Sequence, residues 1–70
     1  MTKITINTEY IKLDSFLKLC GAAPDGGSAK HIIADGEVKV NGEVCLMRGK
    51  KLRSGDSVET GDRSFEVVSD

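Results

Sequence analysis

The sequence is poor in several residue types and has no long apolar segment. It contains no tryptophan, one proline and one histidine, and its longest apolar runs span three or four residues. A membrane-spanning helix needs about 20 apolar residues, and the apolar part of a secretory signal about 7–15. We therefore expect a chain that stays in the cytoplasm and does not enter a membrane.

The two cysteines do not form a recognisable metal motif. Cys20 and Cys45 lie far apart, without a C-x-x-C motif, and His31 is the one histidine available to join them. Because a structural zinc site needs about four ligands, we expect no metal. The sequence leaves open whether the two thiols form a disulfide or act as small buried apolar residues, and it contains no sign of an oxidising compartment.

The sequence shows no arrangement typical of catalysis. It has no paired nucleophile and base and no close carboxylate pair, and Gly26-Gly27 lacks the longer glycine pattern and the lysine of a P-loop. We expect His31 on a solvated helix surface. The chain is therefore predicted to be a non-enzyme that holds no cofactor.

Apolar periodicity predicts two short helices. A chain of 70 residues and 7.5 kDa has room for one domain, expected over residues 1–70. The second helix is expected to start with Ser28 as its N-cap and to end at Gly36. Apolar residues at helical spacing predict the buried faces of the two helices: Leu13, Phe16, Leu17 and Cys20 in the first, and Ala29, Ile32 and Ile33 in the second.

The remaining segments alternate as strands do. Thr2–Asn7 predicts a first strand, and Asn41-Gly42 predicts a hairpin turn with its return strand at Glu43–Met47. Two more strands are expected at Ser57–Thr60 and Ser64–Val68, the last pairing with the first. The predicted fold class is α+β, with two short packed helices against a small, mostly antiparallel sheet.

Charge is distributed unevenly along a chain of net charge −1. Residues 1–55 carry nine basic and six acidic side chains, whereas residues 56–70 carry one basic and five acidic ones. The basic run from 48 to 53 is typical of a solvated loop, but packing of the helices beside the hairpin would give one surface suited to phosphates. The residues predicted to form this binding surface are Lys12, Ser28, Lys30, Lys39, Asn41, Arg48, Lys50, Lys51 and Arg53. Ser28 and the amides at the start of the second helix are expected to hold one phosphate.

The few aromatic residues narrow the ligand class. Only Tyr10, Phe16 and Phe65 are aromatic, and both phenylalanines are expected in the core. A platform that stacks unpaired bases therefore lacks its side chains, and no long basic helix is present to fill a DNA major groove. The composition favours a folded or helical RNA, recognised by backbone and shape.

Three segments together resemble a known family. The first is Lys12-Leu13-Asp14-x-Phe16-Leu17, the second runs from Ala29 to Gly42 and contains Gly-x-Val-x-Val-Asn-Gly, and the third is Lys51-Leu52-x-x-Gly55-Asp56-x-Val58. Their order and spacing are similar to those of the RNA-binding domain named after ribosomal small-subunit protein four. The resemblance covers about residues 12–59. Gly26-Gly27-x-Ala29-Lys30 and the Arg48–Leu52 segment further resemble the small standalone members called YaaA-like and YbcJ-like.

The resemblance implies an αL motif, in which two helices and a β-hairpin form one face that holds ribosomal or transfer RNA. It places the family's basic contacts at the lysines and arginines named above and puts Asn41 at the hairpin tip. Gly26 and Met47 stand where family members often carry a basic residue. These departures imply RNA binding that is weaker or assisted by a partner, such as the ribosome or a ribosome-assembly factor.

A second hypothesis belongs to another class. The acidic C-terminal segment and the expected exposure of Leu19, Leu46 and Met47 are typical of an adaptor on the ribosome whose basic loop meets an acidic protein surface. Under either hypothesis we expect a monomer.

Overall fold

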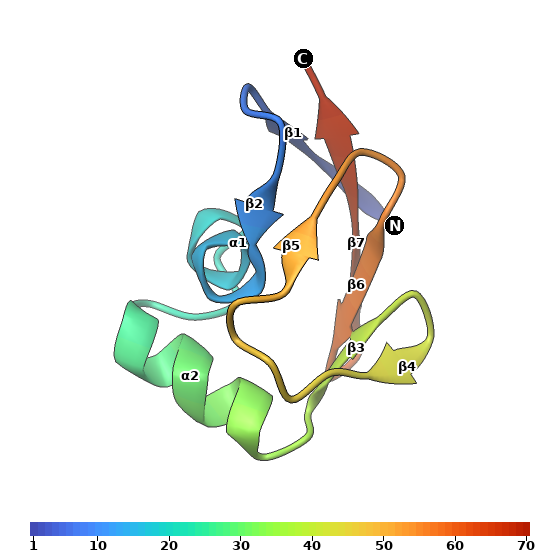
Figure 1. Cartoon of the computed structure of the whole chain (residues 1–70). Coiled ribbons are helices and arrows are strands. Elements are labelled where there is room, and N and C mark those ends of the chain that lie inside the picture. The colour runs from blue at the N-terminus through green and yellow to red at the C-terminus, as the bar shows by residue number, and fades with distance from the viewer.

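The helices and strands follow the two kinds of apolar periodicity in the sequence. The computed structural model describes all 70 residues (Figure 1). Its elements, in chain order, are β1 (Thr2–Ile6), β2 (Ile11–Lys12), α1 (Leu13–Leu19), α2 (Gly26–Ala34), β3 (Val38–Val40), β4 (Glu43–Val44), β5 (Lys51–Leu52), β6 (Ser57–Thr60) and β7 (Arg63–Ser69). No helix is long and apolar enough to cross a membrane.

Five of the strands form one sheet in the order β1-β7-β6-β3-β4. β1 pairs with β7 in parallel, and the other neighbours are antiparallel, as the α+β prediction requires. The last strand pairs with the first, as expected. At the β3–β4 hairpin, Asn41 and Gly42 have φ of 52° and 86°, which explains the choice of these two residues for the turn.

The return strand of the hairpin is shorter than predicted. β4 ends at Val44, whereas the sequence predicted a strand as far as Met47. The amide of Cys45 still donates to the carbonyl of Val38 at 2.9 Å, but the chain then leaves the sheet and crosses to the start of α1 (Figure 1). The apolar residues after Val44 therefore lie in a connecting segment. In such a segment, an alternation of apolar and polar side chains does not indicate a strand.

The core lies between the two helices and one face of the five-stranded sheet. It contains 13 buried residues, including the predicted helix faces at Leu13, Phe16, Leu17, Ala29 and Ile33. Phe16 and Phe65 meet edge to face with their ring centroids 6.2 Å apart, so both phenylalanines are core residues as predicted. Ile32 is half-buried and packs against the same cluster.

The second helix begins three residues earlier than predicted. Asp25, not Ser28, is its N-cap, because the Asp25 carboxylate accepts a hydrogen bond from the Ser28 amide at 2.7 Å. Gly26 and Gly27, which lie before the predicted N-cap, begin the first helical turn. Asp and Ser are about equally good N-caps, so the sequence could not choose between them without the backbone geometry.

The two cysteines are free thiols. Both Cys20 and Cys45 are half-buried and pack against the core. Of the two alternatives that the sequence left open, the structure therefore shows small apolar packing residues and not a disulfide.

Candidate nucleic-acid interface

A small second sheet, which the sequence did not predict, brings two distant basic segments together. β2 and β5 pair antiparallel, with Ile11 opposite Leu52 and Lys12 opposite Lys51. Leu52 is buried and Ile11 half-buried, so Lys12 and Lys51 project together from the other face. Like charges directly opposite one another destabilise a sheet. An anionic ligand that bound both lysines would relieve this repulsion.

The start of α1 holds the basic loop in place. The Leu13 amide donates to the carbonyl of Lys50 at 2.9 Å, and the Asp14 amide donates to that of Arg48 at 3.1 Å. The N-cap residue Lys12 provides no side-chain cap, so these carbonyls satisfy two helix amides that would otherwise lack partners. The loop is thereby fixed beside Lys12.

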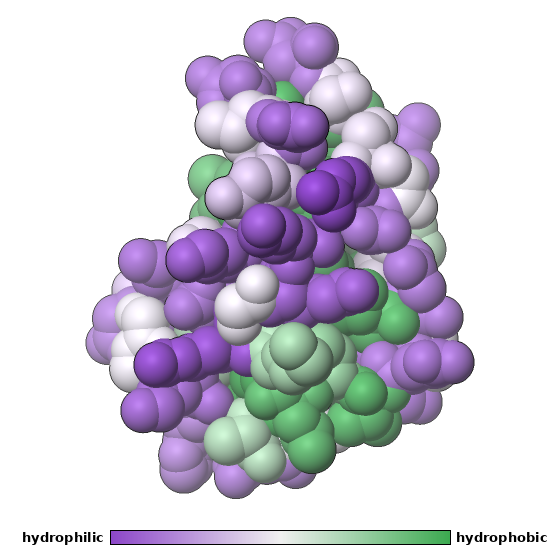
Figure 2. All heavy atoms as spheres, viewed as in Figure 1, coloured by the Kyte–Doolittle hydropathy of each residue, from purple (hydrophilic) through white to green (hydrophobic).

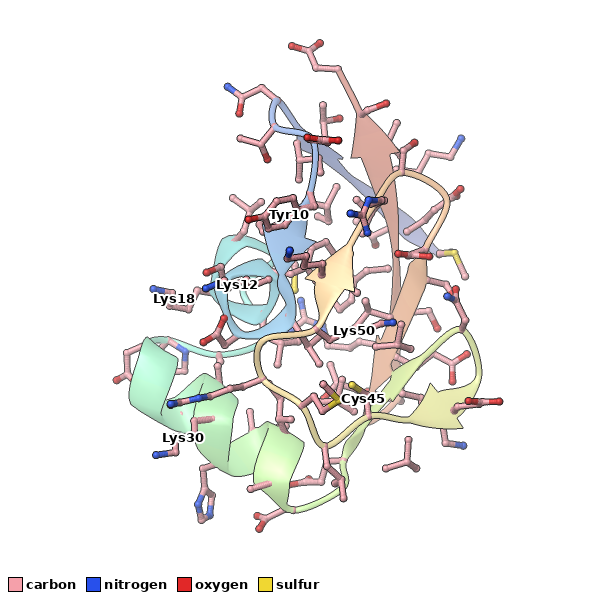
Figure 3. The ribbon with its side chains drawn as sticks, viewed as in Figure 1. Tyr10, Lys12, Lys18, Lys30, Cys45 and Lys50 are labelled. Carbon is pink, nitrogen blue, oxygen red and sulfur yellow. The ribbon has the colours of Figure 1, made fainter.

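Seven exposed cations form what we call the basic face. They are Lys12, Lys18, Lys30, Arg48, Lys50, Lys51 and Arg53. Figure 3 shows Lys12 on β2, Lys18 and Lys30 on the helical side, and Lys50 between the helices and the hairpin. In Figure 2, hydrophilic residues form a band across the middle of this view, above a hydrophobic area.

Lys18 was missed by the sequence reasoning. It lies in the last turn of α1, and its charge acts on Asp25 at the start of α2, so it stands beside the loop that joins the helices. Helical spacing could have predicted its exposure, because Phe16 and Leu17 lie on the buried side of the helix and Lys18, the next residue, falls on the exposed side.

The carboxylates near the basic face are engaged with amides rather than with its cations. Asp14 accepts from the Ser15 amide, Asp25 from the Ser28 amide, and Asp56 from the Arg53 amide and the Asn41 side chain. The one contact within 4 Å between a basic side chain and a carboxylate joins His31 Nε2 to Asp35, 3.3 Å apart on the exposed side of α2, and involves no residue of the basic face. The cations of the basic face are therefore free to meet phosphates.

Lys39 lies elsewhere, contrary to the expectation of one shared surface. Its neighbours Val38 and Val40 are buried in the core, so Lys39 projects from the opposite face of the five-stranded sheet. Glu59 lies directly opposite it on β6. Glu66, opposite Lys3 on β1, shares this outer face. Lys39 therefore lies beside acidic residues of the C-terminal segment and does not belong to the basic face.

Asn41 has a structural task at the hairpin tip. Its side-chain oxygen accepts from the Ser57 amide at 2.9 Å, and its side-chain nitrogen donates to Asp56 at 3.1 Å. Both ends of the side-chain amide are therefore engaged. These bonds join the hairpin turn to the turn before β6, which explains why the Val-Asn-Gly and Gly-Asp runs occur together in this sequence.

The phosphate position predicted at Ser28 is already occupied by a carboxylate. The hydrogen bond from the Ser28 amide lowers the pKa of Asp25 below its ordinary value of 3.8, and the charge of Lys18 adds to this effect. Ser28 is half-buried beneath this cap. A phosphate at the start of α2 would have to displace Asp25, so we leave Ser28 out of the basic face.

The Asp25 cap predicts a pH-dependent contribution to stability. Because the pKa of Asp25 is lower in the folded chain, its stabilising effect is complete above about pH 4 and is lost as the pH falls through the folded-state pKa. We expect Asp25→Ala to lower the melting temperature at pH 7, and the deficit to shrink at pH 3. Circular dichroism melts of both proteins at the two pH values measure this. An equal deficit at both would show that the carboxylate charge plays no part.

Comparison with known proteins places this geometry in a family. The sequence pattern of the S4 domain matches residues 4–68. RlbA of Bacillus subtilis strain 168, named "Probable ribosome maturation protein RlbA", is 48% identical over 67 residues, which are 94% of each chain. YbcJ of Escherichia coli strain K12 is 37% identical over 60 residues, 86% of each chain.

A solved structure agrees with the fold. The solution structure of E. coli YbcJ, described as revealing an αL motif involved in RNA binding, superimposes with a TM-score of 0.74 at 33% identity. The match covers 97% of this chain and 87% of YbcJ. The two packed helices, the hairpin and the sheet order described above are thus those of an αL-motif fold, and the chain belongs to the S4 domain family.

Proposed function

We propose that this protein is a non-enzymatic RNA-binding module that docks on structured RNA through the basic face. The observation that carries the proposal is the pairing of β2 with β5, which places Lys12 opposite Lys51 and fixes Arg48 and Lys50 beside them. Cations gathered on one surface without carboxylate partners suit the phosphates of a nucleic acid backbone better than an ordinary solvated surface does.

The relatives support the choice of RNA and of its cellular setting. YbcJ is described by its αL motif involved in RNA binding, and RlbA by its name in ribosome maturation. We propose that this chain likewise acts in the cytoplasm as a monomer, on ribosomal RNA or on a ribosome-assembly intermediate, with transfer RNA as the other candidate.

The salt dependence of binding tests the electrostatic part of this proposal. If about five phosphates are contacted on duplex RNA, the logarithm of the association constant should fall against the logarithm of salt concentration with a slope of about −4 to −5. Fluorescence anisotropy of a labelled ribosomal RNA hairpin between 50 and 300 mM KCl measures it. A slope near zero would mean that the basic face does not meet phosphates.

A second candidate function is favoured by an apolar patch beside the basic face. Val44, Leu46 and Met47 are 54%, 63% and 67% exposed and line one groove with Lys50. This agrees with the expected exposure of Leu46 and Met47, and supports an adaptor that meets a protein with acidic and apolar residues. Partners that stay attached to the tagged protein after nuclease treatment would favour the adaptor; partners released by nuclease favour RNA binding.

A further inference from the structure

One exposed aromatic ring stands among the cations of the basic face. Tyr10 is 36% exposed, unlike the two phenylalanines of the core. The ammonium of Lys51 lies 4.9 Å from its ring centroid, and the guanidinium carbon of Arg53 lies 5.8 Å from it. Figure 3 shows Tyr10 next to β2, above Lys12.

The pairing of β2 with β5 explains this arrangement. Tyr10 and Lys12 are two residues apart on one extended segment, and Lys51 and Arg53 are two residues apart on the other, so all four side chains project from the same side. The hydrogen bond from the Thr8 hydroxyl to the carbonyl of Tyr10, at 2.8 Å, holds the backbone in front of β2. The backbone that carries the ring is therefore held in place by the fold.

A hollow of the surface borders the ring. It is lined by Tyr10 and Lys12, by Ser15 and Leu19 of α1, by residues from the end of β1 and the segment that follows it, and by Asp70. Leu19 is 55% exposed there, so the hollow offers apolar contact beside the Lys12 ammonium and the Ser15 hydroxyl, and Asp70 is its one acidic lining residue. These are the contacts that a flat heteroaromatic base with its own phosphate requires.

We infer that Tyr10 and this hollow form a subsite for one unpaired nucleotide of the bound RNA. The base stacks on the Tyr10 ring within the hollow, while Lys12, Lys51 and Arg53 neutralise the phosphates on either side of it. The inference rests on the proposed RNA-binding function and narrows the ligand class. The preferred RNA is a helix interrupted by a bulged or looped-out nucleotide, not a continuous duplex.

The composition of the chain supplies a direct probe. Tyr10 is the only tyrosine, and there is no tryptophan, so tyrosine emission reports on this residue alone. Three RNA hairpins of equal helix length, each closed by the same non-nucleotide linker so that no loop base is available, should be compared: one with a single bulged adenosine, one with an abasic residue at the bulge, and one fully paired. We expect the bulged adenosine to quench Tyr10 emission at saturation, and the abasic and paired hairpins to leave most of it.

Variants separate stacking from charge. Tyr10→Phe keeps a ring and should bind the bulged hairpin within about twofold of the parent, whereas Tyr10→Leu should bind it about tenfold more weakly, a typical loss for one stacked base. Tyr10→Leu should bind the abasic hairpin as the parent does. Circular dichroism melts of each variant confirm that it is folded under the assay conditions.

The outcomes distinguish the two proposals. Equal affinity of parent and Tyr10→Leu for the bulged hairpin, with equal emission in all three complexes, would overturn the Tyr10 subsite and leave the RNA-binding function standing. Failure of the parent to bind any of the hairpins at 50 mM salt would overturn the proposed function and the subsite with it.

Discussion

Reversing the charge of Lys50 and Lys51 is expected to weaken binding to structured RNA by more than tenfold. Both lysines are exposed on the basic face, and Lys51 lies directly opposite Lys12 in the β2–β5 pair. Replacing both by glutamate removes two phosphate contacts and puts two negative charges against the RNA backbone. Filter binding or anisotropy at fixed salt concentration measures the loss.

The outer face of the sheet offers a matched control. Lys3 and Lys39 are also exposed lysines, and the Lys3→Glu, Lys39→Glu double variant changes the net charge of the chain by the same amount. Both positions project from the sheet face that does not carry the basic face, so we expect its affinity to change by less than about threefold. Equal losses in the two double variants would indicate attraction by net charge alone, and no loss in either would refute the basic face.

The second large effect concerns the core on which this face is built. We expect Phe16→Ala to lower the free energy of unfolding by about 3–5 kcal/mol, because Phe16 is fully buried and its ring packs edge to face on Phe65. A domain of this size is stabilised by only about 4–10 kcal/mol. The variant should therefore be partly or wholly unfolded at 37 °C, as urea unfolding followed by circular dichroism would measure.

Leu19 supplies the control on the same helix. It is 55% exposed, so Leu19→Ala should change the free energy of unfolding by no more than about 0.5 kcal/mol. If Phe16→Ala cost as little as Leu19→Ala, the assignment of Phe16 to the centre of the core would be wrong.

The elements that the sequence predicted well are those with a local signal. The apolar stripe of the first helix repeats over two turns, and the Asn41-Gly42 pair needs only its own backbone preferences to form a turn. The predicted faces at Phe16 and Ala29 are indeed buried. Each of these features depends on neighbours within a few residues, so it could be read without knowing the rest of the fold.

The features that were missed depend on distant partners. β2 and β5 have two residues each, too few to show alternation, and they pair across some 40 positions of sequence. The hydrogen bond between Asn41 and Asp56 likewise spans a gap of 15 residues. The sequence marked Asn41 as an exposed turn residue, and only the position of the neighbouring turn shows that its side chain is used within the fold.

The candidate site was predicted in part. The basic run from Arg48 to Arg53 stands out in the sequence, and the structure places its four cations beside Lys12. Lys39 could have been set apart, because strand alternation with the buried Val38 and Val40 requires it to face away from the core. Tyr10 had no pattern to mark it, since its significance comes from the two cations that meet its ring.

The sequence by itself determined the α+β class, the two helix faces, the hairpin turn and the excess of positive charge before residue 56. Each of these follows from the spacing of nearby residues or from residue counts. The tertiary structure alone decided which cations share a surface. That surface exists because backbone hydrogen bonds join β2 to β5 and the start of α1 to the Arg48–Lys50 loop, and such bonds between main-chain groups leave no trace in the identity of the side chains.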